Sequence, residues 1–290
     1  MTYPPITKAV FPIAGLATRM MPITKAVSKE MLPVFDRPLI EFAVVEALQA
    51  GIETFIFIIA PHQEQIKGYF APNPTLLDVL KQQNRHEELA ALHSLHRLSD
   101  SIHYVVQDMP LGLGHAVYCA QDIIGDDAFA VISPDDLLFG HGLEKLVQGW
   151  NDTGVMQVLV EEIALDLAHL YGIVGFRDEK TGALAAMIEK PQQTPPSPWG
   201  IIGRYVLPAR IFAHLAKLPP NHKGEIQLTD AMVHVMEEAG AYAQKYHARR
   251  IDCGSLRGWR EANQLLASGM VTAPSSLHAV MRARSNTKQN

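Results

Sequence analysis

Cysteine is scarce in this sequence, since Cys119 and Cys253 are the only two among 290 residues. They have neither the spacing of metal ligands nor that of a disulfide framework, which is typical of proteins from a reducing cytosol. No basic segment followed by a long apolar one begins the chain, and the most apolar run, residues 55–60, is far too short to cross a bilayer. We therefore expect a cytoplasmic protein with no membrane partner.

An excess of positive charge is also missing. The formal net charge is −5, and charged residues make up 19% of a chain that is 48% hydrophobic, which is the composition of a folded globular protein. A mildly acidic chain lacks the overall field that attracts nucleic acid or anionic lipid. We expect no nucleic-acid partner, and small anionic substrates would require a local set of basic groups and a metal ion.

Two common nucleotide-binding motifs are absent. The chain has no G-x-G-x-x-G, and no lysine-serine/threonine pair follows Gly15 at the spacing of a Walker loop. A plain NAD-dependent oxidoreductase therefore fits poorly. Any phosphate site must be built in another way.

Short apolar runs alternate with amphipathic segments. Residues 9–14 and 54–60 predict buried strands, and between them Pro38 opens a helix that Gly51 ends. This order indicates a parallel βαβ unit. The pattern continues with predicted strands at 103–107, 128–133 and 155–161, and with predicted helices at 113–124 and 142–153. We expect an α/β fold with a doubly wound, mainly parallel mixed sheet flanked by helices.

Other segments modify this plan. Residues 75–98 predict an inserted helical hairpin. Strands at 171–176 and 183–189 flank a turn at 179–182, which predicts a small antiparallel extension of the sheet. Further helices are expected at 226–239 and 257–268, and the Ser-, Arg- and Asn-rich residues 272–290 are expected to fray. Ligands of such sheets bind at the carboxyl ends of the strands.

The loop after the first strand contains Ala14, Gly15 and Arg19, followed by Lys25 and Lys29. Glycine allows the backbone to approach an anion closely, and the basic side chains could neutralise phosphate charge. This pattern predicts a phosphate-binding loop. The alternative is an ordinary turn with solvated basic residues.

Polar residues follow two other strands. Asp135 and Asp136 come directly after a buried run, where carboxylates are well placed to hold magnesium against phosphates; an Asx turn or a helix cap is the alternative. Gln107 offers a donor and an acceptor to a base edge, and the glycines of the following segment let backbone reach a flat ring. His115 in that segment is interpreted as a capping or packed residue rather than a functional one.

Glu189 and Lys190 lie at the end of a predicted strand. The carboxylate could accept hydrogen bonds from sugar hydroxyls, and the ammonium could hold a phosphate. A solvated ion pair is the competing interpretation.

Taken together, the sequence resembles the bacterial UTP–glucose-1-phosphate uridylyltransferases, also called UDP-glucose pyrophosphorylases. The resemblance extends from about residue 7 to about residue 270, and its motifs occur in the family's order. They are PIAGLATRMMPITKAVSKEMLPV (12–34), PLGLGHAV (110–117), SPDD (133–136), YGIVGF (171–176), IEKP (188–191), IIGRYVL (201–207), GEIQLTDA (224–231) and DCG (252–254).

The resemblance implies a GT-A-like Rossmann fold, a homodimer or homotetramer, Mg2+ as the cofactor, and UTP and glucose 1-phosphate as substrates. It implies one nucleotidyltransferase domain over residues 1–271, with a nucleotide half at about 7–160, a sugar-phosphate half at about 161–271 that includes the antiparallel extension, and a C-terminal tail at 272–290.

The resemblance also implies roles at matching positions. The residues expected at the uracil are Ala14, Gly15, Gln107 and Gly112. The triphosphate would be bound by Arg19 and Lys29, and magnesium by Asp135, assisted by Asp252. The glucose would be lined by Gly172, Glu189 and Gly203, and its phosphate held by Lys190. Glu225 and Gln227 would shape the sugar side.

Two residues depart from the family pattern. Ala17 stands where most relatives have glycine, and Ser28 where they usually have proline. If position 17 needs a positive φ, alanine costs about 1–2 kcal/mol there. These departures keep open a non-catalytic or weakly active paralogue that binds UDP-glucose. A related nucleotidyltransferase that uses dTTP is a second alternative.

Overall fold

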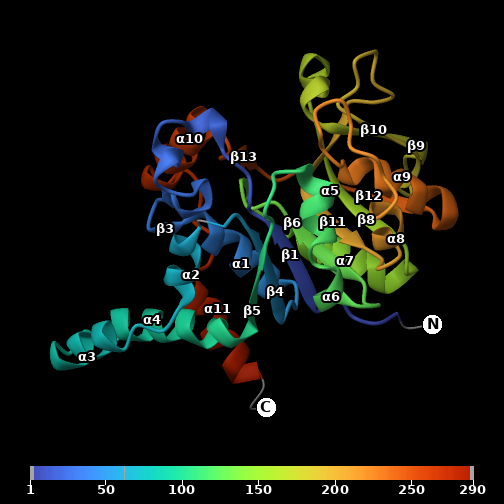
Figure 1. The fold of residues 1–290 in the computed structure, drawn as a ribbon. Helices are drawn as coiled ribbons and strands as arrows, with labels where there is room; N and C mark the ends of the chain where they lie inside the picture. Colours follow the sequence, from blue (N-terminus) through green and yellow to red (C-terminus); the bar gives the residue numbers. More distant parts are fainter. Residues whose placement is uncertain (1–2, 62, 288–290) are drawn as a thin grey trace.

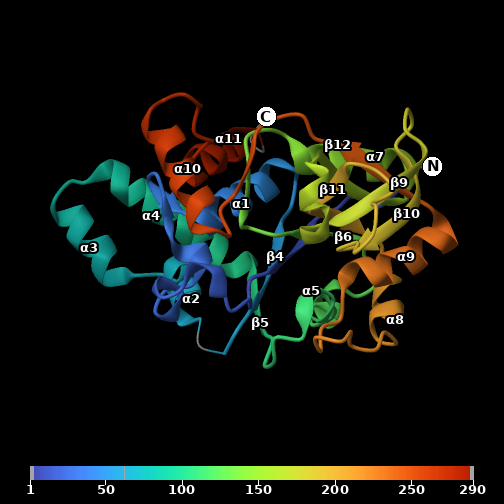
Figure 2. The same ribbon diagram turned by 90° about the horizontal axis from the view of Figure 1, so that it is seen from above.

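The computed structural model describes residues 3–61 and 63–287. A nine-stranded sheet forms the centre, with helices on both of its faces (Figures 1 and 2). Its strands, in spatial order, are β5 (Ile102–Val106), β4 (Thr54–Ile59), β1 (Lys8–Pro12), β6 (Phe129–Ile132), β11 (Trp199–Leu207), β8 (Met156–Glu162), β12 (Ala241–Lys245), β10 (Ala183–Glu189) and β9 (Gly172–Asp178). The predicted α/β fold with a mixed sheet is confirmed.

The direction of the strands changes in the middle of the sheet. Strands β5, β4, β1 and β6 are parallel to one another, but β11 is antiparallel to both of its neighbours, β6 and β8. Strands β8 and β12 are again parallel, and β9 and β10 form an antiparallel hairpin at the edge. The sheet is therefore parallel throughout only in its first half, because the long strand β11 enters from the opposite end.

Alternate residues of the central strands face two separate cores. In β1, Ala9 and Phe11 belong to one core and Val10 to the other, and the same alternation holds in β4 and β6. Successive side chains of a strand point to opposite faces, so a strand buried on both faces is apolar throughout. Each fully buried large side chain, such as Phe11, stabilises the fold by about 1.5–3 kcal/mol.

The helices divide between these two cores. One face is covered by α1 (Leu39–Gln49), α7 (Gly142–Thr153) and α11 (Leu277–Thr287), and the other by α5 (Gly112–Tyr118), α8 (Ile211–Leu215) and α9 (Leu228–Ala239) (Figure 2). Helix α7 has the predicted bounds and ends where Gly154 adopts a left-handed conformation. The predicted helix 113–124 is instead two helices, α5 and α6 (Gln121–Ile124). Within residues 3–61 and 63–287, every helix is too short or too polar to span a membrane.

The expectation that residues 272–290 fray is wrong for residues 277–287, which form α11 and pack against α1 and α4 (Figure 1). Leu277 and Val280 are buried in the core, and Arg284 Nη1 donates to the carbonyl oxygen of Ile52 at 3.2 Å. Helix α11 therefore packs against the protein through an apolar stripe, although the composition of the helix is polar. Residues 288–290 lie outside the described part of the chain.

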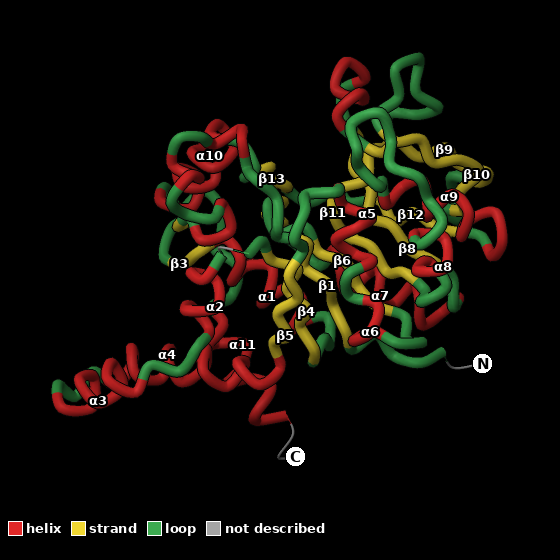
Figure 3. The backbone as a smooth tube through the Cα atoms, viewed as in Figure 1, coloured by secondary structure: helices red, strands yellow, loops and turns green. Residues whose placement is uncertain are grey.

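The predicted helical hairpin at 75–98 is confirmed. It consists of α3 (Pro74–Gln82) and α4 (His86–Leu98), and α3 projects away from the body of the protein (Figures 1 and 3). Asn73 caps α3 by accepting a hydrogen bond from the Leu76 N–H at 3.0 Å. Further helices and strands are α2 (Glu64–Phe70), α10 (Leu256–Ala267), β2 (Pro33–Val34), β3 (Arg37–Pro38), β7 (Asp136–Leu138) and β13 (Arg250–Asp252).

Candidate active site

A pocket of about 460 Å³ opens near the carboxyl end of β6 and beside the β9–β10 hairpin. Segments that are far apart in the sequence form its walls. The predicted residues that line it are Arg19, Asp135, Gly172, Glu189, Lys190, Gly203, Gln227 and Asp252, whereas Lys29 is not among the lining residues. The structure therefore brings predicted phosphate, metal and sugar residues to one cavity.

Strands β7 and β13 pair antiparallel with Asp136 opposite Asp252, and this pairing brings the segment of Asp135 beside Asp252. The Cys253 N–H donates to the Asp135 carbonyl oxygen at 2.8 Å, which ties the two segments together. A Cβ at Gly254 would lie 2.9 Å from both Asp135 Oδ2 and Asp252 Oδ1, and 3.0 Å from Arg19 Nη2. Glycine thus leaves open a cradle between the two carboxylates.

Lys29 lies against this cradle. Its Nζ is 2.5 Å from Asp135 Oδ2, and the two side chains are 17% and 20% exposed. Burial lowers the pKa of Lys29, but the Asp135 and Glu30 carboxylates outweigh it and hold the pKa above its ordinary value. Burial raises the pKa of Asp135, but Lys29 outweighs it and holds that pKa below its ordinary value. The pair is therefore ionised, and a cation already faces the Asp135 carboxylate.

The loop after β1 carries Arg19 on the short helix Thr18–Met20. Arg19 Nη1 lies 3.7 Å from Asp252 Oδ2, and the side chain is 65% exposed, so it can turn toward a ligand. Ala17 has φ 48° and ψ 40°, the left-handed conformation in which an L-residue costs about 1–2 kcal/mol. Thr24 Oγ1 supports this conformation by donating to the Ala17 carbonyl oxygen at 3.0 Å. Lys25 is exposed and does not line the pocket.

Ser28 provides a contact that proline could not. Its N–H donates to Gln65 Oε1 at 3.2 Å, and Gln65 Nε2 donates to the Ala26 carbonyl oxygen at 2.5 Å. Proline has no N–H. The segment before Lys29 is therefore tied to α2.

The four residues expected at the uracil do not line the 460 Å³ pocket. They lie where β1 and β5 end and α5 begins, and they are Ala14, Gly15, Gln107 and Gly112. Gln107 Nε2 lies 3.3 Å from the Gly112 carbonyl oxygen and 2.8 Å from His115 Nδ1. His115 is thus a packed partner of Gln107, which agrees with its interpretation from the sequence.

The glycines of this segment serve the protein's own packing. A Cβ at Gly112, which has φ +92°, would lie 2.9 Å from the Ile226 carbonyl oxygen, and one at Gly114 would lie 2.8 Å from the same atom. Both glycines therefore let α5 approach the 225–227 segment closely. Gln227 of that segment lines the pocket and donates to Glu225 Oε2 at 2.9 Å, whereas Glu225 is not among the lining residues.

The β9–β10 hairpin positions the predicted sugar residues, because Glu189 pairs with Gly172 in its register. Glu189 Oε2 accepts a hydrogen bond from Thr229 Oγ1 at 2.6 Å, and Glu189 Oε1 lies 3.1 Å from Lys190 Nζ. A Cβ at Gly203, which has φ +60°, would lie 2.8 Å from Asp136 Oδ2. The glycines keep this part of the pocket open between charged groups.

No role was assigned to Arg250 or Thr229 from the sequence, and Asp136 was named only with Asp135 as a carboxylate that could hold magnesium. Arg250 Nη1 lies 2.5 Å from Asp136 Oδ1, its Nε 2.6 Å from Glu161 Oε2, and its Nη2 3.1 Å from the Tyr171 hydroxyl. Burial raises the pKa of Asp136 to about 6, although Arg250 opposes the rise. Thr229 lies inside the 224–231 motif, whereas no motif contains Arg250.

No cluster of three or more His, Cys, Asp or Glu side chains suited to a metal ion occurs in the part of the chain that the structure describes. The Asp135–Asp252 pair is therefore an incomplete site. It suits a cation whose other ligands are water or substrate oxygens.

Comparisons with known proteins agree with this geometry. A family model described as nucleotidyl transferase matches residues 8–269. The chain is 39% identical to a UTP–glucose-1-phosphate uridylyltransferase from Komagataeibacter xylinus, over 90% of this chain and 94% of that protein. It is 36% identical to one from Bacillus subtilis, over 88% of each.

Solved structures are similar as well. A UTP-bound UGPase from Acinetobacter baumannii has a TM-score of 0.84 at 35% identity and covers 96% of this chain and 98% of that one. A UDP-glucose pyrophosphorylase complexed with UDP-glucose has a TM-score of 0.81 at 34% identity, with 91% and 99% covered.

Proposed function

The chain belongs to the UTP–glucose-1-phosphate uridylyltransferases, and we propose that it transfers the uridylyl group of UTP to α-D-glucose 1-phosphate, giving UDP-glucose and pyrophosphate. One observation supports this reaction above the others. Arg19, Asp135 and Asp252 line the same pocket as the Glu189–Lys190 pair, and Lys29 is bonded to Asp135, so a site for phosphates and a site for a sugar phosphate adjoin.

The nucleotide occupies the side formed by β1, β5 and α5. Ala14, Gly15, Gln107 and Gly112 contact the uracil, and Arg19 and Lys29 bind the triphosphate. The position of Gly112 next to Leu113, which lines the pocket, supports this arrangement. So does the cluster of positive charge near Asp135, because phosphate oxygens are bound by such groups.

Asp135 and Asp252 hold a magnesium ion. Their carboxylates are hard oxygen donors, and the cradle that glycine leaves at position 254 lies between them. Mg2+ in proteins is usually held by one or two carboxylates together with substrate phosphates and water. When bound, it supplies charge neutralisation at phosphate oxygens.

Glucose is lined by Gly172, Glu189 and Gly203, and Lys190 holds its phosphate. An oxygen of that phosphate attacks the α-phosphorus of UTP, the bond to the β-phosphate oxygen breaks, and pyrophosphate leaves. The attacking group is already anionic, so no strong general base is required. Lys190 orients the nucleophile, while Arg19 and Lys29 hold the leaving pyrophosphate, so catalysis is mostly alignment and charge neutralisation.

The organisation inferred from the sequence belongs to the same proposal. It includes one domain over residues 1–271, a nucleotide half at about 7–160, and a sugar-phosphate half at about 161–271 that holds the antiparallel hairpin. It also includes a homodimer or homotetramer that works in the cytoplasm. Size-exclusion chromatography with light scattering tests the oligomeric state.

A pyrophosphate-release panel tests the reaction itself. UTP, dTTP, ATP and GTP are each combined with glucose 1-phosphate, galactose 1-phosphate and glucosamine 1-phosphate at saturating Mg2+. UTP with glucose 1-phosphate should give the highest kcat/KM. Preference for dTTP would replace the uridylyl assignment with thymidylyl transfer. Tight binding of UDP-glucose without turnover would identify a non-catalytic paralogue instead.

A further inference from the structure

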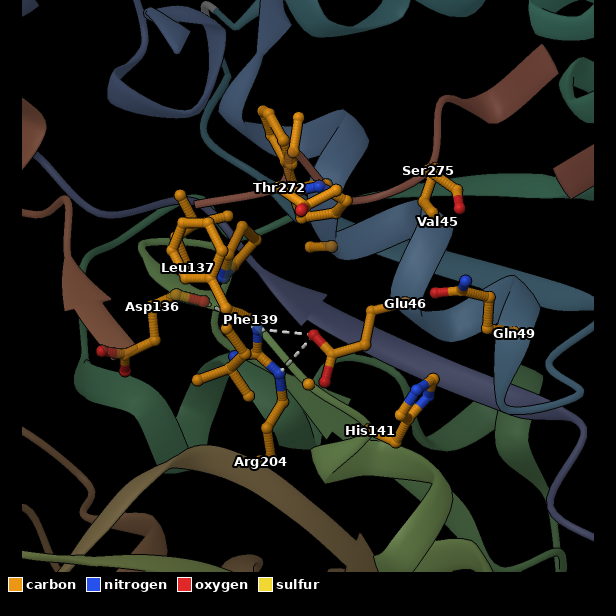
Figure 4. A pocket seen from close by; sticks show the side chains of 17 residues that line it. Val45, Glu46, Gln49, Asp136, Leu137, Phe139, His141, Arg204, Thr272 and Ser275 are labelled. Carbon is orange, nitrogen blue, oxygen red and sulfur yellow. Dashed lines mark hydrogen bonds and ion pairs between the residues drawn. The ribbon is translucent and has the colours of Figure 1, made fainter. Parts of the chain in front are cut away.

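A second cavity, of about 260 Å³, lies behind the turn that carries Asp135 (Figure 4). The turn spans residues 133–136 and is closed by a 3.4 Å hydrogen bond from the Asp136 N–H to the Ser133 carbonyl oxygen. Ser133 and Asp135 line the active-site pocket, Pro134 lines the second cavity, and Asp136 lines both. The turn is therefore the wall between the two.

Arg204 and Glu46 lie in this second cavity and face each other (Figure 4). Glu46 Oε2, from α1, accepts from Arg204 Nε at 3.0 Å and from Nη2 at 2.8 Å. The Arg204 side chain is 1% exposed and that of Glu46 is 13% exposed. This is a buried ion pair that joins β11 to α1.

The remaining donors of Arg204 point to the turn. Nη1 donates to the Ser133 carbonyl oxygen at 2.7 Å and to the Gly203 carbonyl oxygen at 3.2 Å, and Nη2 donates to the Asp136 carbonyl oxygen at 2.8 Å. All N–H donors of the guanidinium are thus engaged within the protein. The cavity therefore offers no free guanidinium donor to an anionic ligand, and the guanidinium instead connects both ends of the turn.

Stability alone does not account for this arrangement. Glu46 Oε1 is buried and has no hydrogen-bond partner among the described residues, which is unfavourable. A buried ion pair is also weak evidence for stability, because apolar residues of similar volume often serve as well or better. What apolar residues cannot supply is the set of hydrogen bonds to the Ser133 and Asp136 carbonyls.

We propose that Arg204 and Glu46 are positioning residues: Arg204 clamps both ends of the 133–136 turn, Glu46 fixes the guanidinium, and together they hold Asp135 where the site requires it. This inference rests on the proposed function, since Asp135 matters for activity only if it serves the transferase reaction. Other bonds also support the turn, among them Ser133 N–H to the Gly203 carbonyl oxygen at 2.8 Å. Loss of the clamp should therefore loosen the turn without unfolding it.

The decisive variant replaces both charges at once, Glu46→Leu with Arg204→Met. It should fold cooperatively with a lower Tm, because loss of the ion pair itself costs little but the Ser133 and Asp136 carbonyls lose their donors. Its kcat should fall about 10- to 100-fold, because small displacements of catalytic groups have effects of that size. Calorimetry should also show weaker binding of Mg2+ together with UTP. Wild-type kcat and binding in the folded double variant would overturn the proposal.

Arg204→Lys is the second variant, in case the double variant does not fold. It keeps the charge opposite Glu46, but a point-charge ammonium cannot bridge Glu46 and both carbonyls as the planar fork does. The same loss of kcat is expected, and an unchanged kcat would count against the clamp. A matched control is Arg37→Met with Glu41→Gln, a buried pair at 3.7 Å that also joins a strand to α1 but touches no residue of the turn. The control should keep the wild-type kcat.

Hydrogen exchange separates this inference from the proposed function. In the double variant and in Arg204→Lys, the amides of Asp136 and Cys253 should exchange faster than in the wild type and the control. That readout does not depend on the reaction. If the wild type made no UDP-glucose, the proposed function would fail, and unchanged exchange at the turn would separately refute the clamp.

Discussion

Replacing Ala17 with glycine is expected to stabilise the protein. Ala17 has φ 48° and ψ 40°, where an L-residue costs about 1–2 kcal/mol and glycine has no such cost. Glycine also has more conformational entropy in the unfolded chain, and this offsets about 0.5–1 kcal/mol of the gain. The free energy of unfolding should therefore rise by about 0.5–1 kcal/mol. In a chain of this size the Tm should rise by roughly 1–3 °C.

Differential scanning calorimetry and urea denaturation measure the effect. Ala26→Gly is the matched control, because Ala26 lies in the same loop but has φ −111° and ψ −26°. That substitution should lower the free energy of unfolding by about 0.5–1 kcal/mol. Equal destabilisation by the two substitutions would show that position 17 is not strained, and the reasoning from its φ would be refuted.

Three further predictions concern the site. Asp135→Asn should lower kcat about 100-fold or more while leaving the fold intact, because a charge that faces Lys29 and the proposed metal is lost; wild-type activity in a coupled pyrophosphate-release assay would contradict the metal assignment. Lys190→Ala should raise the KM for glucose 1-phosphate much more than the KM for UTP. Steady-state kinetics with each substrate varied in turn measure both values, and an equal rise in the two would contradict this prediction. Burial raises the pKa of Glu30 to about 7. A carboxyl group whose pKa is higher in the folded state than in the unfolded state stabilises the fold fully at pH values below its unfolded pKa, and this stabilisation is lost as the pH rises through about 7. Glu30→Gln should therefore become more stable relative to the wild type between pH 5 and pH 8, by up to about 3 kcal/mol, and a constant difference in urea denaturation would refute this.

Local patterns predicted most of the elements, because a helix or strand depends first on residues near in sequence. Helix α7 has the predicted bounds, and β4 follows from its run of apolar and β-branched residues. The order and direction of the strands were harder to predict from local patterns. That β11 runs antiparallel between β6 and β8 depends on contacts across the sheet, and a strand's own residues do not state its direction.

Helix α11 shows a different limit. Its polar composition predicted fraying, but Leu277, Val280 and Met281 recur at helical spacing and pack against the core. The periodicity was present in the sequence. Its significance depended on whether α1 and α4 offered an apolar surface for it, which is a property of the folded protein.

The sequence by itself determined which chemical groups this protein brings to its site: the basic loop after β1, the aspartates after β6, and the Glu189–Lys190 pair. Local order of the chain and motif spacing were enough for that. Only the tertiary structure decided how these groups are held, as in the Arg250–Asp136 and Arg204–Glu46 pairs. The physical reason is that Glu46 and Arg204 are 158 positions apart, so their contact arises from the packing of α1 against the sheet and leaves no local pattern in the sequence.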